Sequence, residues 1–407
     1  MTQLNKLIAT LLLSSPAMLL AQGFQVNLQG QKQQAMGGAG TALPQDAATV
    51  FFNPGAISFL KQNQFTLGVS PTIAKGVFLE DNTNVLSQTK SPVSYPFTYY
   101  GAYAINEKLK VGLGAYTPFG STMKWENGWS GRFALTKLQL FAVFIQPTLS
   151  YKINEKWGIG GGFVYATGKV NLQKDLPIID NSGNYATASL SGNANGFGGN
   201  FGIYYKPTEK LSFGLTYRTQ VNMKVNSGKA TFNVPSSLAD QFPNTTFKSS
   251  LPLPQVLTLG IAYKATDKLT LAFDANFVGW KAYKKLEFDY KDTTATLQNT
   301  ISERNYKNTY SFRLGGQYMV TEKFAARLGL SYLITPIQSG YVTPEVPDAT
   351  RLNFTGGLGY KVNDHFTVDA SFTFENLKRS DKNKETNLMG TYKTYIYVPG
   401  ISVIYNF

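Results

Sequence analysis

The chain has 407 residues, of which 14% are aromatic and only 15% are charged, and it contains no cysteine. The absence of cysteine excludes a disulfide framework and a thiolate metal site, while 24 tyrosines, 28 phenylalanines and 38 glycines favour strands over helices. The formal net charge of +14 is typical of nucleic-acid-binding proteins, but the lysines and arginines are spread over turns and loops, which argues against a nucleic-acid partner.

Residues 1–21 have the pattern of a secretory signal peptide. Lys6 precedes the apolar stretch 7–21, which is too short for a spanning helix and is interrupted by two serines and a proline. Ala21 supplies a small residue before the expected cleavage site, so we predict a mature chain from 22 to 407. No later run of about eighteen apolar residues follows, and the sequence therefore contains no candidate membrane-spanning helix.

Residues 22–60 show neither alternation nor a helical period. They are nevertheless rich in small and apolar residues, whereas a disordered tail would carry more charge. A barrel of intermediate width needs something to occupy its interior. We therefore predict that 22–60 is an N-terminal plug, or hatch, inside a barrel formed by 61–407. The alternative is a loosely attached tail.

A short polar motif recurs six times within 61–407. Each copy places Asn or Thr before an acid, then a basic residue, then a bulky residue that opens the next apolar segment. The side chain of Asn or Thr can bond the backbone of its own turn, so each copy predicts a tight turn. The copies lie at 106–109, 154–157, 208–211, 266–269, 321–324 and 363–366.

Apolar and polar residues alternate after these turns, as strands with one apolar face require. The alternating segments run roughly nine to twelve residues, the length of a tilted membrane strand, whereas strands of soluble proteins average about five or six. Six turns on one side with both chain ends on that side require seven hairpins. We therefore predict an all-β protein, a transmembrane barrel of fourteen antiparallel strands, with centres near residues 69, 100, 112, 146, 163, 202, 217, 258, 274, 313, 329, 357, 370 and 399.

The last strand ends in Phe407, which shares a face with Tyr405 and Val403. A terminal aromatic residue on the lipid face is typical of bacterial outer-membrane barrels, so we expect that location. Pro399 interrupts this strand and lacks an N–H for the ladder. We expect a bulge or a kink there.

Several segments resemble the FadL/TodX family of outer-membrane transporters of hydrophobic compounds. The similar segments are Gly23-Phe24-Gln25, 46–50, Asn53-Pro54, 116–120, 129–132, 251–254 and 343–348. The resemblance implies a fourteen-stranded barrel with a hatch whose Asn-Pro-Ala motif gates the channel, here Asn53, Pro54 and Gly55. Glycine in place of that alanine is expected to loosen the local turn. The resemblance also implies passive uptake of long-chain fatty acids or aromatic hydrocarbons by a monomer.

The same resemblance places a lateral opening of the barrel wall at Tyr116, Pro118 and Gly120. Lateral exit is physically reasonable because an apolar molecule gains more from entering lipid than from entering water. Pro118 removes one ladder hydrogen bond, which is compatible with a gap.

Two groups of side chains are candidates for substrate binding. The first group consists of four large aromatic residues in and beside one loop: Phe119, Trp125, Trp129 and Phe133. They either capture an apolar ligand or anchor in lipid headgroups, and both interpretations stay open. Among the lumen charges, Arg218 and Arg327 could receive a carboxylate. The other interpretation is that the lumen charges pair with one another or with the plug.

Catalysis is not expected. The only histidine, His365, lies in a predicted turn, and the glycines at 158–162 follow a turn within an alternating strand, where close packing of the plug or strand bending explains them better than phosphate binding. No cofactor or metal is predicted. The expected partners are a hydrophobic small molecule, outer-membrane lipid and lipopolysaccharide. The alternative functions are a narrow porin for small polar solutes and a surface adhesin or scaffold.

Overall fold

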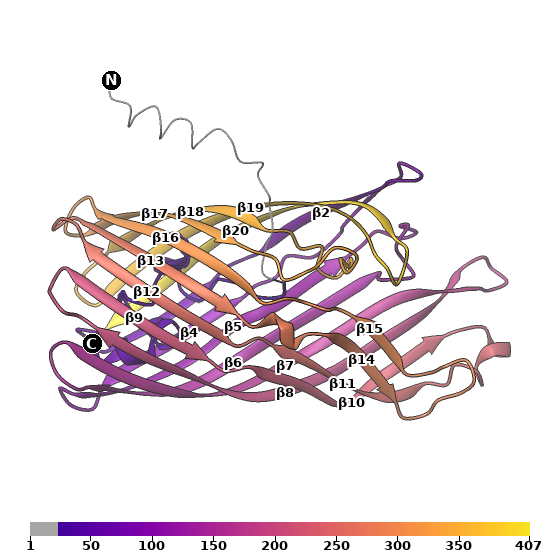
Figure 1. Cartoon of the computed structure of the whole chain (residues 1–407), viewed down its shortest axis with the longest axis horizontal. Helices are drawn as coiled ribbons and strands as arrows, with labels where there is room; N and C mark the ends of the chain where they lie inside the picture. Colours follow the sequence, from indigo (N-terminus) through magenta and orange to yellow (C-terminus); the bar gives the residue numbers. More distant parts are fainter. Residues whose placement is uncertain (1–22) are drawn as a thin grey trace, which may run out of the picture.

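The computed structural model describes residues 23–407, so the predicted signal peptide lies outside the described residues (Figure 1). The described chain forms a closed antiparallel barrel of 14 spans, as predicted. Six of these spans are interrupted, which gives 20 strand segments. Short turns and the C-terminus lie at one end of the barrel, and long loops extend from the other (Figure 1). No helix within 23–407 is both long and apolar enough to cross a membrane.

The interrupted spans are formed by consecutive segments, and the remaining spans by single strands. In chain order the segments are β1 (Gln64–Val69) with β2 (Ile73–Glu80), β3 (Leu86–Gln88) with β4 (Phe97–Ala104), β5 (Leu109–Lys124), β6 (Lys137–Lys152), β7 (Trp157–Ile179), β8 (Tyr185–Tyr205), β9 (Leu211–Arg218) with β10 (Val221–Asn233), β11 (Thr245–Leu253) with β12 (Val256–Lys264), β13 (Leu269–Val278) with β14 (Lys285–Tyr290), β15 (Thr300–Glu303) with β16 (Thr309–Met319), β17 (Phe324–Leu333), β18 (Arg351–Lys361), β19 (Phe366–Lys382) and β20 (Met389–Asn406). Short 3-10 turns η2 (Ser236–Leu238) and η3 (Trp280–Ala282) lie among the long loops. Every predicted strand centre falls within one of these strands.

The first and last spans close the barrel. β1 pairs with β4 on one side and with β20 on the other, so that Phe65 lies opposite Tyr405. The amide of Phe407 donates to the carbonyl of Asn63 at 3.0 Å. Closure leaves β1 and β20 without a free edge, which removes the site at which another strand could add.

Of the bulge or kink expected at Pro399, the bulge is absent, because β20 keeps one continuous register with β19 from Tyr405 to Met389. The irregularity lies in the strand on the other side. β1 ends at Val69 opposite Ile401 and β2 begins at Ile73 opposite Tyr397, which places Pro71 opposite Pro399. Neither proline has an N–H to leave unpaired, so the break between β1 and β2 accommodates both.

The six turns have the predicted chemistry. In the first, the side-chain oxygen of Asn106 accepts hydrogen bonds from the amides of Lys108 and Leu109 at 3.0 and 2.9 Å. The same bonds recur with Asn or Thr in the other five copies. In three turns a hydrogen bond and the charge of a neighbouring lysine hold the pKa of the acid below its usual range, at Glu209, Asp267 and Asp364.

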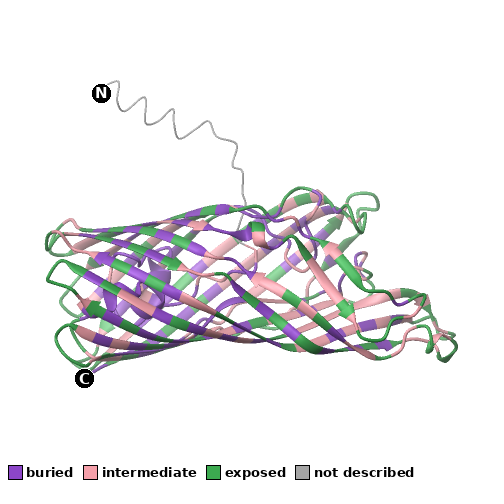
Figure 2. Ribbon diagram, turned by 60° about the horizontal axis from the view of Figure 1, so that its bottom comes forward, coloured by how far each residue is buried: buried purple, intermediate pink, exposed green. Residues whose placement is uncertain are grey.

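Residues alternate between the inside and the outside of the barrel along each strand (Figure 2). The outer face is a band of exposed apolar side chains such as Leu259, Leu314 and Leu358, which suits contact with lipid. Stacked aromatic rings mark the end of this band near the turns, where the ring centroids of Phe65 and Phe407 lie 5.2 Å apart.

Residues 23–60 lie inside the barrel, toward the end with the short turns (Figure 1). They form α2 (Gln31–Ala35), α3 (Thr49–Phe52) and the 3-10 helix η1 (Pro54–Phe59), and almost all of their side chains are buried. α2 packs against β17, β18 and β19, whereas η1 packs against β5, β6, β7 and β8. The segment thus contacts opposite parts of the wall, an arrangement consistent with the predicted plug.

Candidate functional site

The barrel wall is irregular where β5 passes the N-terminal segment. β4 pairs with β5 only as far as Tyr116, and the register of β5 against β6 shifts between Tyr116 and Phe119. Two residues of β5, Thr117 and Pro118, oppose a single residue of β6 there, so β5 has one extra residue. Beyond Tyr116, one edge of β5 therefore lacks its neighbouring wall strand. We call this edge, residues 117–123, the β5 gap.

The N-terminal segment covers the β5 gap with backbone hydrogen bonds. The amide of Val26 donates to the carbonyl of Pro118 at 3.0 Å, and the amide of Gly120 donates to the carbonyl of Phe24 at 3.0 Å. Gln25 lies opposite Phe119 as an antiparallel bridge. Residues 24–26 thus act as a short additional strand on an otherwise open edge.

A cavity of about 420 Å³ adjoins the β5 gap, and we call it the gap cavity. Its lining includes Asp348 and Arg351 from inside the barrel and Phe141 and Val143 from the outward face of β6. The cavity therefore extends from the barrel interior toward its outer surface.

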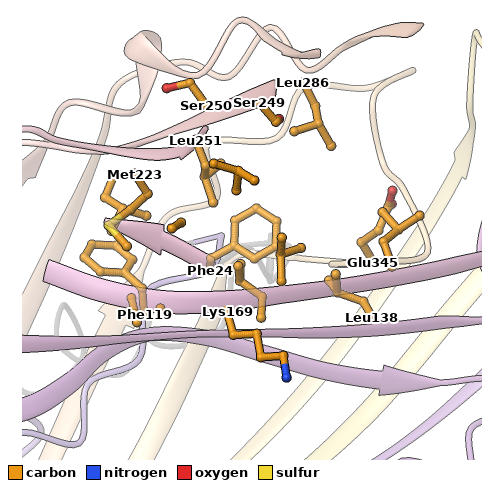
Figure 3. A pocket seen from close by; sticks show the side chains of 18 of the residues that line it. Phe24, Phe119, Leu138, Lys169, Met223, Ser249, Ser250, Leu251, Leu286 and Glu345 are labelled. Carbon is orange, nitrogen blue, oxygen red and sulfur yellow. The ribbon is translucent and has the colours of Figure 1, made fainter. Parts of the chain in front are cut away.

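A second cavity, of about 70 Å³, is lined mostly by buried residues and is almost entirely apolar (Figure 3). We call it the inner cavity; its lining includes Phe24, Met223, Leu251 and Leu286. Phe24 is only 7% exposed and its ring packs edge to face against Tyr283 at 6.2 Å. The two cavities are adjacent, since they share the lining residues Phe119, Leu140, Phe141 and Glu345.

The four predicted aromatic residues do not form one surface groove. Trp125 and Trp129 are each 2% exposed and stack on each other with ring centroids 4.2 Å apart. Their indole N–H groups donate to the carbonyls of Pro344 and Leu135. Phe133 is exposed and packs against Tyr185 instead, so of the four only Phe119 lines the cavities. Neither capture at an exposed surface nor anchoring in headgroups fits the two tryptophans, because residues of other strands, among them Phe78 and Tyr392, cover them.

The two predicted arginines are paired inside the barrel. The guanidinium of Arg218 lies 3.9 Å from the ring centroid of Phe51, in the N-terminal segment, and Arg327 forms an ion pair of 2.7 Å with Asp369. Neither arginine lines the inner cavity or the gap cavity. Arg313 and Asp274 likewise bond the N-terminal segment, through the backbone of Gly38 and of 40–41. This arrangement matches the interpretation in which lumen charges hold the plug.

The charged residues of the cavities form two ion-pair groups, and of these residues sequence reasoning missed Arg304. Arg304 and Glu345 line the inner cavity and form an ion pair of 3.2 Å. Arg351 and Asp348 line the gap cavity, and Asp348 accepts a 2.8 Å hydrogen bond from the amide of Gly23. Burial raises the pKa of Asp348. The segment 343–348 was noticed as a family-like motif, but Arg304 lies between strands, where no periodicity points to it.

The predicted gate residues hold the N-terminal segment against β7 and β8. Asn53 donates to the carbonyls of Thr41 at 2.8 Å and Ile203 at 3.0 Å, and its side-chain oxygen accepts from the amide of Gly55. A Cβ atom on Gly55 would lie 2.6 Å from the carbonyl oxygen of Gly202. The missing methyl group at Gly55 therefore permits close packing against β8.

The glycines of β7 have the packing role proposed for them. A Cβ atom on Gly158 would lie 2.4 Å from the carbonyl oxygen of Gly55, and one on Gly160 would lie 2.4 Å from that of Pro54. The described residues contain no cluster of His, Asp or Glu that could hold a metal ion.

Solved structures and curated proteins resemble this chain over nearly its whole length. A Pseudomonas aeruginosa FadL homologue superposes with a TM-score of 0.82 at 18% identity, over 95% of this chain and 100% of the other. The toluene transporter TodX of P. putida superposes with a TM-score of 0.75 at 16% identity, over 93% of this chain and 98% of the other. The 47 kDa outer membrane protein of Pasteurella multocida is 26% identical over 100% of both chains. The long-chain fatty acid transport protein of Escherichia coli K12 is 21% identical over 90% of each.

A family model described as outer membrane protein transport protein (OMPP1/FadL/TodX) matches residues 12–407. This match agrees with the barrel, its outer-membrane location and the expectation that the protein is not an enzyme. The chain therefore belongs to the OMPP1/FadL/TodX family of outer-membrane transporters of hydrophobic compounds.

Proposed function

We propose that this protein takes up hydrophobic compounds by passive diffusion and releases them sideways through the β5 gap. The observation that carries the proposal is the pairing of residues 24–26 with the open edge of β5. A wall strand bonded along both edges could not separate without losing many ladder hydrogen bonds. Here only a few backbone bonds to a short segment cover the edge.

In the proposed pathway a ligand enters from the loop end, reaches the inner cavity and displaces Phe24 from it. Displacement of Phe24 pulls on Gln25 and Val26, which cover the β5 gap, so occupation of one cavity opens the next. The ligand then leaves through the β5 gap, past the outward side chains of Phe141 and Val143, into the apolar band of the barrel surface. The Asn53 to Gly55 region anchors the rest of the N-terminal segment and keeps the lumen closed to water.

The cargo class follows from the lining and from the relatives. The inner cavity is apolar, and the similar proteins named above include a long-chain fatty acid transport protein and a toluene transporter. Long-chain fatty acids and aromatic hydrocarbons are therefore the two candidate cargoes. We also propose that the protein acts as a monomer, since one chain closes the barrel and supplies both cavities.

Locking the N-terminal segment to β5 tests lateral exit. Gln25 and Phe119 form a pair flanked by the two backbone hydrogen bonds, the pair type with the shorter Cα separation, which suits a disulfide. The natural chain has no cysteine, so Gln25→Cys with Phe119→Cys gives one defined crosslink. Uptake of labelled long-chain fatty acid and of toluene is measured in cells that lack their own transporter. Phe119→Cys alone is the matched control.

We expect oxidation to block uptake by the double variant and reduction to restore it to the level of the control. Uptake that is unaffected by the crosslink would exclude exit through the β5 gap. A second variant without residues 22–60 tests the plug, and we expect it to conduct ions freely in planar bilayers. If the intact protein takes up neither compound yet conducts ions, the narrow porin for small polar solutes is the better description.

A further inference from the structure

We infer that the inner cavity selects uncharged ligands, with or without one hydroxyl group, and discriminates against ionised carboxylates. The inference rests on the proposed function and narrows its cargo to neutral molecules.

The only cation directed at the inner cavity is already neutralised. Arg304 is 5% exposed, and its guanidinium forms a 3.2 Å ion pair with Glu345 and also donates to Ser302. Lys169 borders the cavity with its stem, but it lies on the outward face of β7 and its amine points away from the cavity (Figure 3). No free positive charge among the described lining residues is therefore available to a carboxylate.

The gap cavity carries more negative than positive groups. Its charged lining residues are Arg351 and the three acids Glu345, Asp348 and Glu375. Arg351 is paired with Asp348 at 3.2 Å and with Glu375 at 2.7 Å. With Arg304 included, two arginines face three carboxylates along the proposed path. A carboxylate would lose its hydration in this region and gain no counter-charge.

Glu345 supplies the polar feature that a neutral ligand could use. One of its carboxylate oxygens bonds Arg304, whereas the other, Oε2, is buried and has no hydrogen-bond partner among the described residues. Glu345 lines both cavities, so a ligand that passes from one to the other passes this oxygen. An unpaired carboxylate oxygen accepts a hydrogen bond from a hydroxyl group and repels a second carboxylate.

Binding of two ligands that differ only in their head group tests the inference. The full mature chain is placed in lipid nanodiscs and titrated calorimetrically with 1-dodecanol and with dodecanoate at pH 8, with empty nanodiscs as the blank. We expect dodecanol to bind at least tenfold more tightly than dodecanoate. Toluene serves as a neutral ligand that has no hydroxyl group.

Glu345→Gln identifies the residue responsible. The change removes the negative charge beside the cavities and leaves Arg304 unpaired, so we expect the preference for dodecanol to fall at least tenfold. Glu322→Gln, in an exposed turn at the opposite end of the barrel, removes the same charge and should preserve the preference. Thermal unfolding confirms that each variant is folded.

The outcomes separate this inference from the proposed function. If none of the three ligands binds and cells take up none of them, the proposed function fails. If the ligands bind but dodecanoate equals or exceeds dodecanol, neutral selection is overturned and the channel stands. If the preference exists but Glu345→Gln leaves it unchanged, the assignment to Glu345 is overturned.

A separate observation on the outer surface supports a second inference. Lys378 of β19 lies directly opposite Lys393 of β20, and Lys75 and Lys382 lie on the same outward face of β2, β20 and β19. Like charges opposed in this way destabilise a strand pair. The acids of these strands point inward; Glu375 pairs with Arg351 and Asp381 accepts from backbone amides.

We propose that these four lysines bind the phosphate groups of a lipid headgroup in the outer leaflet, where lipopolysaccharide is the phosphate-bearing lipid. Lys378, Lys382 and Lys393 lie on the loop side of an aromatic cluster formed by Phe374, Tyr395 and Tyr397, and Lys75 lies opposite Tyr395. Such aromatic residues mark the membrane interface, so the lysines stand at the height of the headgroups. None of the four forms an ion pair with a described residue.

Native mass spectrometry with purified lipopolysaccharide, with its dephosphorylated form and with inorganic phosphate tests this site. We expect retention of intact lipopolysaccharide and at least tenfold less retention after Lys378→Gln with Lys393→Gln. The matched control is Lys108→Gln with Lys268→Gln, in turns at the other end of the barrel. Equal retention of the dephosphorylated lipid, or equal retention by both double variants, would overturn the proposal, and binding of inorganic phosphate alone would exclude a lipid source.

Discussion

Removal of the Phe24 side chain should loosen the cover over the β5 gap. Phe24 is nearly fully buried in the inner cavity, and full burial of such a ring stabilises by about 1.5–3 kcal/mol. The two backbone hydrogen bonds that cover the gap persist in Phe24→Ala, so the ring contribution is the part that is lost. A loss of about 2 kcal/mol corresponds to a roughly 30-fold larger population of the uncovered state.

Hydrogen exchange of single amides measures this population. The amides of Val26 and Gly120 donate the two bonds that cover the gap, and their exchange depends on local opening. We expect both to exchange roughly 30-fold faster in Phe24→Ala, following the same estimate of ring burial. Phe59→Ala removes an aromatic residue near the other end of the N-terminal segment, beside Tyr204, and should leave both amides unchanged. Unaltered exchange in a folded Phe24→Ala chain would refute the claim that Phe24 holds the cover in place.

Three further predictions concern the wall and the N-terminal segment. Pro118→Val restores an N–H to the bulged part of β5, and we expect several-fold slower uptake; normal transport would contradict the role of this bulge in exit. Gly160→Ala places a methyl group 2.4 Å from the carbonyl oxygen of Pro54, so we expect it to lower the free energy of unfolding by about 1–3 kcal/mol and to lower the Tm. In the control Gly316→Ala the nearest atom lies 3.4 Å from the new methyl group, so the Tm should not fall. Burial raises the pKa of Asp46, although Lys32 opposes this, so the folded chain holds that proton more tightly than the unfolded chain. Protonated Asp46 therefore contributes its full share of the folding free energy below pH 3.8, the ordinary pKa of Asp. This contribution is lost as the pH rises through the higher pKa of Asp46 in the folded chain. Asp46→Asn should accordingly raise the Tm more at neutral pH than at about pH 3, and a pH-independent change would argue against this account.

The strands could be predicted from the sequence because each has a local cause. Alternation of side chains and the Asn or Thr turns are properties of neighbouring residues, so all predicted strand centres were correct. The interruptions were less predictable because they depend on what stands opposite. Pro399 appeared to be a defect of its own strand, yet the break lies at Pro71, which is more than 300 residues away in sequence.

The site was only partly predictable for the same reason. The family-like motif at 116–120 predicted a lateral opening at Tyr116, Pro118 and Gly120, and the register of β5 shifts within the same segment. The ion pair of Arg304 with Glu345 joins two loop regions without periodicity, so no local pattern indicates it. The burial of Trp125 and Trp129 also depends on distant residues, since Trp129 packs on Phe78 and Trp125 on Tyr392.

Closure of the barrel by β1 and β20 imposes an order on assembly. β1 cannot pair with β20 until the last strand has joined the sheet, so a partly assembled barrel carries two unpaired edges. The N-terminal segment bonds residues such as Thr355 and Ser371, more than 300 positions later, and it must already lie within the curving sheet when the seam closes. Without the end of β20, the edges of β1 and β19 would thus stay unpaired and the N-terminal segment would be exposed. Completion of the barrel therefore depends on the last strand.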